Sequence, residues 1–372
     1  MLSLYKNAVY QKKSSKMNDN VDLGILYDIA PKSLGELSKR IPDAIIAGFA
    51  KCGTGTMHYF LEQHPEISIA EGEVHYYNYN FLYNKGIDWY QDRMNVAYKS
   101  QLVLETTAAY TINNATPERI FNVNPKTKFI ILMRNPVHRA ISHYKMMNFM
   151  DLYVKNINNA DTFFDKNVNL SSYTPYNQRF YTDGLYINHL SNVLHYFNRS
   201  QILLINSENF VKYPWKTLKR VENFLKIKPY FNKNKFVFSA PKRFYCICKN
   251  SYTYFKKDLR KVTCDNPMIQ EEVSCMSSRK GFRKIVINST TINNLYKYYA
   301  KTNLQLEKKN PVCLIITGLL YSYYHSNRKL IVENSGKKSS LWVTPEFLTA
   351  FENFTIINGC RLSLTLNSNT SL

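Results

Sequence analysis

Short apolar runs alternate along this chain with segments in which apolar residues recur at helical spacing. The runs are continuous, as in strands that are buried on both faces of a sheet, and they cover residues 44–48, 101–106, 128–133 and 202–205. Apolar residues spaced three or four apart predict helices that begin near Thr56, Pro117, Val137, Leu190, Leu218 and Ile292. Strands that alternate with helices predict an α/β domain in which helices cover both faces of a parallel sheet.

Four stretches lack such a pattern. Residues 72–90 are rich in aromatic residues, and we interpret them as an irregular loop that lines a cleft, while the polar residues 148–176 predict a second long loop. Residues 1–41 predict a mobile lead-in, and residues 309–372 a C-terminal extension whose role the pattern does not indicate. No apolar run reaches the roughly 18 residues that a transmembrane helix needs.

The first strand ends in a turn that is rich in glycine and threonine. Residues 51–55 read KCGTG, and a helix is predicted from about Thr56 to Pro65. Free N–H groups at a helix N-terminus, together with Lys51, suit a phosphate or a sulfate, so the turn indicates a nucleotide site. The turn departs from the Walker A pattern, which needs its lysine directly after the last glycine. The alternative interpretation is an ordinary glycine-rich turn between a strand and a helix.

Two further positions are candidates for chemistry. Arg134 directly follows the third strand, and Ser142 lies eight residues on, about two helical turns away on a similar face. An arginine fork and a hydroxyl suit a phosphate, although a surface arginine with a solvent-facing serine is the alternative. Glu73 is a candidate general base, and it shares a face with His75 if this segment is extended. Without further motifs, Glu73 is equally one surface carboxylate among many.

The formal net charge is +22, from 49 Lys and Arg residues against 27 Asp and Glu residues. This excess indicates a polyanionic partner, namely nucleic acid, an acidic membrane or an acidic glycan, unless it is only a solvated basic surface. No zinc finger, RNP motif or basic helix is present, so a nucleic-acid partner is not expected. An acidic glycan or membrane therefore remains as the partner that the charge suggests.

The cysteines and sequons bear on the compartment. Cys246, Cys248, Cys264 and Cys275 lie close together without zinc-ligand spacing, which favours a local disulfide loop in an oxidising compartment. Six N-x-[ST] sequons agree with a secreted glycoprotein, and they begin at Asn114, Asn169, Asn198, Asn288, Asn353 and Asn369. The first residues have no apolar segment adequate for a signal peptide. Either the true N-terminus is absent from this sequence, or the protein is cytosolic and its cysteines are reduced.

Taken in order, the motifs KCGT, EVHYY, GIDWY, PERI, RNPVHRAISHY and YINHLSNVLHYF are specific. The chain resembles the heparan sulfate sulfotransferase family over roughly residues 42–308, and most closely the glucosamine 3-O-sulfotransferases. The resemblance implies a P-loop-like, three-layer α/β fold and PAPS (3′-phosphoadenosine 5′-phosphosulfate) as cosubstrate, with no metal. It also implies heparan sulfate or a related acidic glycan as acceptor. The implied location is the Golgi lumen, with membrane attachment only through an anchor outside this sequence.

The resemblance also implies roles for single residues. The 5′-phosphosulfate loop would comprise Lys51, Cys52, Gly53, Thr54 and Gly55. Arg134 and Ser142 would bind the 3′-phosphate. A later loop that closes on the nucleotide would comprise Lys280, Gly281, Phe282 and Arg283. Glu73 would be the general base, His75 would orient the base or the acceptor, and Lys51 would offset charge on the leaving phosphate. Cys246 and Cys275 would form the disulfide of the family, and Cys248 and Cys264 a second, nested bridge.

Three positions depart from the pattern of the 3-O-sulfating members. Ala50 stands where an arginine precedes the loop lysine, Asn78 where an aspartate stands, and Thr106 where a lysine helps to hold the glycan. The donor site is therefore better supported than the acceptor site. An N-sulfating relative and a catalytically impaired protein that binds sulfated glycans remain as alternatives.

Overall fold

The computed structural model describes residues 35–149, 160–165, 175–240, 244–250, 271–274, 286–307, 329–334, 337–342 and 361–365. The chain divides into two compact units. The first unit comprises Met1–Met133, Ser142–Asn156 and Asn188–Ile285, and the second comprises Arg134–Ile141, Ile157–Ile187 and Val286–Leu372. Each unit is described by itself.

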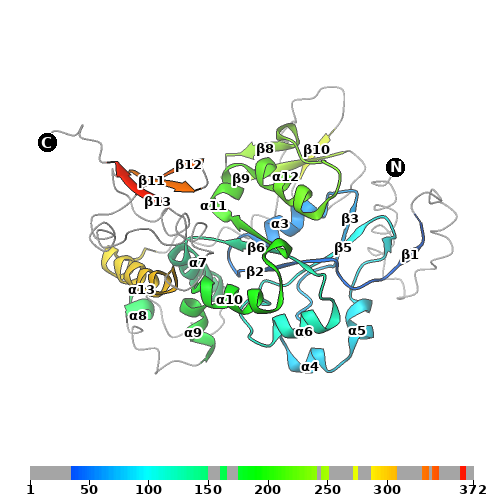
Figure 1. Cartoon of the computed structure of the whole chain (residues 1–372), viewed down its shortest axis with the longest axis horizontal. Helices are drawn as coiled ribbons and strands as arrows, with labels where there is room; N and C mark the ends of the chain where they lie inside the picture. Colours follow the sequence, from blue (N-terminus) through cyan, green and yellow to red (C-terminus); the bar gives the residue numbers. More distant parts are fainter. Residues whose placement is uncertain are drawn as a thin grey trace. The chain divides into compact units, whose positions relative to one another are not determined.

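The core of the first unit is a five-stranded sheet in which all strands are parallel (Figure 1). Its order is β3 (Ile67–Ile69), β5 (Leu102–Thr106), β2 (Ala44–Gly48), β6 (Lys128–Met133) and β7 (Ile202–Asn206). All five residues of the central strand β2 are buried, as a continuous apolar run in a parallel sheet requires. The predicted α/β fold with a parallel sheet is confirmed, and the short strand β3 is an addition that the sequence pattern did not predict.

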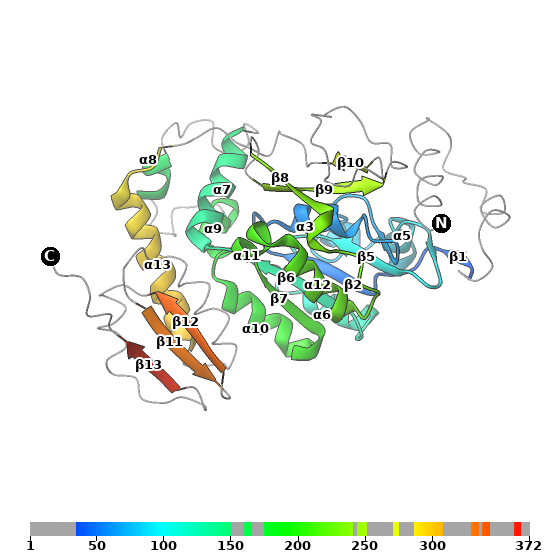
Figure 2. The same cartoon turned by 90° about the horizontal axis from the view of Figure 1, so that it is seen from above.

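Helices cover both faces of this sheet (Figures 1 and 2). Helices α3 (Thr54–Leu61) and α12 (Pro214–Leu225) lie on one face, and α6 (Thr116–Val123) and most of α10 (Tyr186–Tyr196) lie on the other. On the second face, the ring of Phe197 packs 4.7 Å from that of Phe129 on β6 and 5.6 Å from that of Phe121 on α6. These aromatic contacts fix the helical layer to the sheet.

The smaller elements of the first unit correct two expectations. Residues 72–90 are not irregular throughout, because they contain α4 (Asn80–Tyr83) and α5 (Ile87–Asp92), with Tyr76 stacked on Tyr90 at 4.5 Å. Part of the expected lead-in is a strand, since β1 (Leu37–Ser38) pairs antiparallel with β4 (Ala97–Tyr98). The other elements are η3 (Arg199–Gln201), α11 (Ser207–Lys212), η4 (Lys233–Lys235) and the antiparallel strands β8 (Phe236–Ser239), β9 (Phe244–Asn250) and β10 (Glu271–Ser274).

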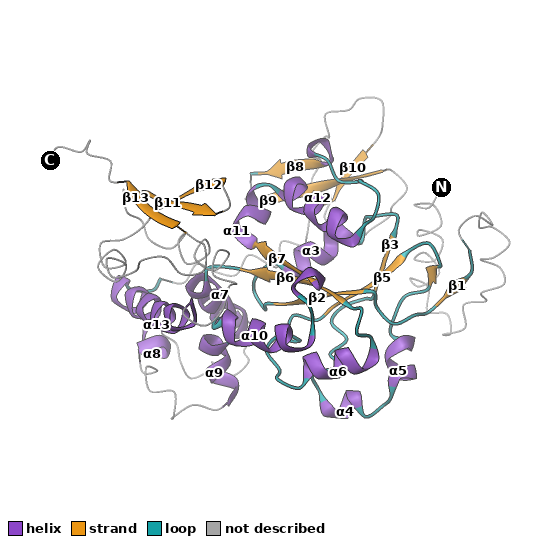
Figure 3. Ribbon diagram, viewed as in Figure 1, coloured by secondary structure: helices purple, strands orange, loops and turns teal. Residues whose placement is uncertain are grey.

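Helix α7 (Pro136–Phe149) begins in the second unit and ends in the first. The second unit also contains α8 (Ala160–Asp165), α9 (Pro175–Thr182) and α13 (Ser289–Glu307) (Figure 3). Helix α8 lies in a stretch that was expected to be a loop. The tail, for which the sequence indicated no role, forms an antiparallel sheet of β12 (Lys337–Trp342), β11 (Lys329–Asn334) and β13 (Arg361–Thr365). In the described part of the chain, no helix has the length and apolar character to cross a membrane.

Candidate active site

The loop between β2 and α3 has the backbone geometry of an anion site. Gly53 precedes the helix with φ 92°, a left-handed conformation that favours glycine, and it starts α3 at Thr54, two residues before the predicted start. In the described part of the chain, the N–H groups of Gly53, Thr54 and Gly55 make no hydrogen bond, and the first turn of α3 has no acidic residue. Unsatisfied N–H groups at the positive end of a helix attract a phosphate or a sulfate.

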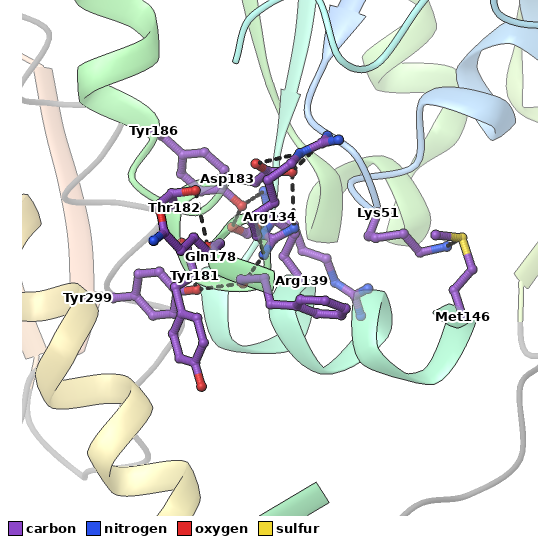
Figure 4. A network of polar contacts seen from close by, with 12 residues as sticks. Lys51, Arg134, Arg139, Met146, Gln178, Tyr181, Thr182, Asp183, Tyr186 and Tyr299 are labelled. Atoms are coloured by element: carbon purple, nitrogen blue, oxygen red, sulfur yellow. Dashed lines mark hydrogen bonds and ion pairs between the residues drawn. The ribbon is translucent and has the colours of Figure 1, made fainter. Parts of the chain in front are cut away.

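Contacts from two other elements hold this loop. The hydroxyl of Ser207, at the start of α11, donates to the carbonyl oxygen of buried Cys52 at 2.5 Å. The ammonium group of Lys51 lies 3.2 Å from the sulfur of Met146 on α7 (Figure 4). A thioether is a weak acceptor, so an anion in the loop would compete well for this ammonium group. The structure thus brings together the five predicted loop residues, Lys51 to Gly55, around one N-terminal helix turn.

Glu73 and His75 form a contact that faces solvent. The carboxylate of Glu73 lies 3.2 Å from Nε2 of His75, and the two side chains are 39% and 27% exposed. His75 has φ 57°, so the segment is not extended, which was the condition for a shared face, yet the two side chains still meet. Nδ1 of His75 lies 3.2 Å from Oδ1 of Asn78, so both ring nitrogens face oxygens. Burial would lower the pKa of His75, but the hydrogen bond and charge of Glu73 outweigh it, and the pKa is raised.

A threonine that sequence reasoning missed holds the segment of this pair. Oγ1 of Thr107 accepts the N–H groups of Val74 at 3.1 Å and His75 at 3.3 Å. Its own proton goes to Oε1 of Glu105 at 2.6 Å. The hydroxyl orientation is therefore fixed, and its lone pairs point at the backbone that carries Glu73 and His75. The available signal was two polar residues in alternation, Glu105 and Thr107, where an apolar strand ends.

Glu105 is a fully buried carboxylate beneath this segment. The hydroxyl of Tyr90 donates to its second oxygen, and Tyr110 also hydrogen-bonds to it. Burial raises the pKa of Glu105, although the hydrogen bonds from Thr107, Tyr90 and Tyr110 act in the opposite direction. The carboxylate therefore organises a set of hydroxyl groups rather than meeting substrate.

The Glu73–His75 pair and the loop lie at the same edge of the sheet. The N–H group of Thr107 donates to the carbonyl of Ile46 at 3.1 Å, and that of Thr111 to the carbonyl of Ala47 at 3.2 Å. Both acceptors belong to the carboxyl end of β2, from which the loop to α3 also leaves. Ligands of open α/β sheets bind at this edge, so a base and an anion cradle are available in one region.

Arg134 occupies the turn after β6 and belongs to the second unit, whereas Ser142 belongs to the first. The spacing had suggested that Arg134 and Ser142 share a helical face. Helix α7 begins only at Pro136, so Arg134 is not on a helical face. Its backbone is held by Tyr186, whose hydroxyl donates to the Arg134 carbonyl at 2.6 Å. Burial and the charge of Arg134 lower the pKa of His138 to about 4, although His138 remains accessible to solvent overall. Ser142 is half-buried on α7.

The second arginine of the RNPVHRAIS segment has a structural role (Figure 4). Arg139 is fully buried, donates to the carbonyl of Phe180 and lies 4.0 Å from the carboxylate of Asp183. The hydroxyl of Tyr299 on α13 donates to the carbonyls of Phe180 and Tyr181 at 3.2 and 3.1 Å. These bonds connect α7, the end of α9 and α13 within the second unit.

Several predicted residues lie outside the described part of the chain. They are Cys264, Cys275, Lys280, Gly281, Phe282 and Arg283. Cys246 and Cys248 on β9 are each in a disulfide bond, while Cys52 is buried and is in no disulfide. Among the described residues, no group of three or more His, Cys, Asp or Glu side chains is placed to hold a metal ion.

Comparisons with known proteins give one consistent picture. The model of the family described as "Sulfotransferase domain" matches residues 41–289. Heparan sulfate glucosamine 3-O-sulfotransferase 5 of Homo sapiens is 31% identical over 273 residues, which cover 73% of this chain and 72% of that protein. Heparan sulfate glucosamine 3-O-sulfotransferase 3B1 of Mus musculus is 33% identical over 217 residues, covering 58% and 54% of the two chains. The crystal structure of a sulfotransferase from Alicyclobacillus acidocaldarius aligns over 72% of this chain and 95% of its own, with a TM-score of 0.50 and 19% identity, and supports the fold alone.

Proposed function

Because this chain belongs to the sulfotransferase family, we propose that it transfers a sulfuryl group from PAPS to a hydroxyl of a heparan sulfate glucosamine, at the 3-position. The observation that carries the proposal is the pairing of two features at one sheet edge. One is the turn at Lys51 with its unsatisfied N–H groups, and the other is the accessible Glu73–His75 pair. The first suits the sulfated nucleotide, and the second suits removal of a proton from a sugar hydroxyl.

In the donor half, the N–H groups of Gly53 to Gly55 and the ammonium of Lys51 hold the 5′-phosphosulfate. For the 3′-phosphate, Arg134 of the second unit offers a guanidinium fork, and Ser142 of the first unit offers a hydroxyl donor. Residues 280–283, which the resemblance assigns to the donor, lie outside the described part of the chain. The donor is used as a substrate and leaves as 3′-phosphoadenosine 5′-phosphate.

In the chemical step, the carboxylate of Glu73 accepts the proton of the attacking hydroxyl. The sugar oxygen forms a bond to sulfur while the bond between sulfur and the phosphate oxygen breaks. Lys51 stabilises the negative charge that develops on that leaving oxygen, because its ammonium group already stands in the loop. His75, held by Asn78 on its far nitrogen, keeps the Glu73 carboxylate in position.

The acceptor assignment rests on the names of the relatives and on the net charge of +22, which suits an acidic glycan. One local observation leaves the position of sulfation on the glucosamine undecided. Thr106 offers no cation at the end of β5, and its hydroxyl lies 2.9 Å from Nδ1 of His58. An N-sulfating activity, or a glycan-binding protein that has lost catalysis, would be compatible with this change.

Radiolabelled PAPS with heparan sulfate tests the proposal. We expect label in the glycan with the wild type, and loss of transfer with Glu73→Gln but not with Glu71→Gln, which removes an exposed carboxylate two residues away. Equal transfer by the two variants would refute Glu73 as the base. Calorimetry with 3′-phosphoadenosine 5′-phosphate separates the alternatives, because a glycan-binding protein without catalysis need not bind it. Mapping the label on a defined oligosaccharide then assigns the position.

A further inference from the structure

A stretch of the first unit outside the candidate site has a strong excess of positive charge. Between residues 212 and 235 the only acidic residue is Glu222, which is fully buried and accepts the backbone N–H groups of Tyr230 and Phe231 at 2.7 and 2.8 Å. The same stretch contains eight cations, which are Lys212, Lys216, Lys219, Arg220, Lys226, Lys228, Lys233 and Lys235. All but Lys235 are exposed.

Five of these cations follow one another from the end of α11 along α12 to the residue after it. We call them the α12 stripe and define it as Lys212, Lys216, Lys219, Arg220 and Lys226. Helical spacing accounts for its centre, because positions 216, 219 and 220 recur at intervals of three and four on one side of α12. The opposite side of α12 carries the buried residues Leu218, Val221 and Leu225. The packing of α12 on the sheet therefore leaves only its polar side exposed.

The stripe begins near the candidate site and leads away from it. Its first member, Lys212, is the last residue of α11, and the first residue of that helix, Ser207, donates a hydrogen bond to Cys52 of the nucleotide loop. At its end, Nζ of Lys128, the first residue of β6, donates to the carbonyl of Phe224 at 2.9 Å. Helix α12 thus runs from the carboxyl edge of the sheet towards the amino edge (Figure 1). The ten steps from Lys216 to Lys226 span about 15 Å at the rise of an α-helix.

Positive groups follow one another along residues 212–226, whose only acidic residue, Glu222, is buried. Lys212 and Lys216 both lie over the ring of Tyr213, at 5.1 and 4.9 Å. At the other end, burial and the charge of Lys226 lower the pKa of Lys128. A surface that holds like charges close together gains stability when a polyanion binds.

We propose that the α12 stripe is a second binding surface for a linear sulfated polysaccharide, and that it takes the part of the acceptor chain that extends beyond the catalytic centre. This inference rests on the proposed function. Cations that follow one another along a helix fit a linear polymer that approaches the carboxyl edge. An anionic membrane is the less suitable occupant, because interfacial helices bury an apolar side in lipid, and the apolar side of α12 faces the sheet.

The test compares two triple variants of the full chain. The stripe variant is Lys216→Gln/Lys219→Gln/Arg220→Gln, and the control variant, Lys85→Gln/Lys99→Gln/Lys126→Gln, removes the same charge from exposed positions elsewhere in the first unit. The probes are long heparin chains, a short heparin oligosaccharide and phosphatidylserine vesicles. Affinity is measured without PAPS over a range of salt concentrations, and far-UV circular dichroism confirms that both variants are folded.

We expect the stripe variant to bind long heparin roughly tenfold more weakly, with a salt dependence reduced by about two to three released ions, since each neutralised anionic group releases about 0.7–0.9 ion. The short oligosaccharide should bind the wild type and the stripe variant equally, and the control variant should resemble the wild type. Equal loss in the two variants, no loss in either, or a loss seen only with vesicles would overturn the proposal. The affinity assay needs no turnover. Absence of sulfate transfer would therefore refute the proposed function but would not show whether the α12 stripe binds a sulfated polysaccharide. Normal transfer with unchanged affinity for long chains would refute the stripe alone.

Discussion

Thr107→Val tests whether the hydroxyl of Thr107 holds the segment that carries Glu73 and His75. Valine keeps the shape of threonine but lacks its hydroxyl. The change removes two bonds in which Thr107 accepts the N–H groups of Val74 and His75, at 3.1 and 3.3 Å. It also removes the bond that Thr107 donates to buried Glu105 at 2.6 Å.

The structure sets the size of the effect on stability. Loss of a donor to a buried carboxylate costs about 1–3 kcal/mol. Val74 and His75 are only half-buried, so water can reach their N–H groups, and each lost bond costs about 0.5–1 kcal/mol. The sum, about 2–5 kcal/mol, is smaller than the total stability of most domains, about 5–15 kcal/mol, so the variant should still fold.

The effect on activity follows from the backbone of His75. A non-glycine residue at φ 57° is held in a conformation that costs about 1–2 kcal/mol, and the bond to Thr107 helps to hold it there. Without that bond the carboxylate of Glu73 is less well placed. Because a misplacement of about 1 Å can cost a factor of about 100, we expect kcat to fall roughly 10- to 100-fold. KM for PAPS should not change, since the nucleotide loop is untouched.

Urea unfolding and sulfate-transfer kinetics measure both effects. The matched control is Thr107→Ser, which keeps the hydroxyl and should retain most of the stability and of kcat. If the valine variant loses stability but keeps wild-type kcat, the support of the pair has no part in catalysis. If serine and valine reduce kcat equally, the hydroxyl is not the group that matters.

Three further predictions follow from single contacts. Gly48→Ala would bring a methyl group against a buried hydroxyl of the neighbouring segment, and urea unfolding should show a loss of about 2–3 kcal/mol. Addition of 3′-phosphoadenosine 5′-phosphate should raise the pKa of His138 in an NMR titration, because a phosphate on Arg134 would offset the charge that lowers it; an unchanged pKa would argue against Arg134 as a ligand. The raised pKa of His75 stabilises the fold below its unfolded pKa of about 6.5, and this stability is lost as pH rises through the folded value. Glu73→Gln should therefore cost more unfolding free energy at about pH 6 than at about pH 9.

The sequence predicted the central sheet because each of its long strands is a continuous apolar run. The pattern of apolar residues does not predict β3, because its three residues are too few to show one. It does not predict α5 either, because the place of this helix depends on stacking of Tyr76 on Tyr90 and Trp89 rather than on periodicity. Helix α3 starts earlier than predicted because the left-handed Gly53 begins it, whereas periodicity detects only its first apolar residue, Met57.

The backbone geometry of the turn from Lys51 to Gly55 could be predicted, because glycine spacing records backbone conformation. The support of the Glu73–His75 pair could not, because it depends on residues about thirty positions away that the parallel pairing of β3 and β5 brings near. Glu105 in particular looks like an exposed charge in the sequence, and only its burial among hydroxyl groups shows that it is an organising acceptor.

Three described positions that the resemblance assigns to the acceptor carry no fixed positive charge, and this bears on how an acidic glycan would be held. Ala50 is apolar, Asn78 is engaged by His75, and the hydroxyl of Thr106 faces His58. These three positions therefore contribute no permanent positive charge beside Glu73. If the acceptor is a polyanion, much of its binding energy must arise away from the reacting hydroxyl, and the α12 stripe is a surface of the same unit that can supply it. Binding energy gained there would raise affinity for long chains without changing which hydroxyl is sulfated, so chain length and position of sulfation should vary independently.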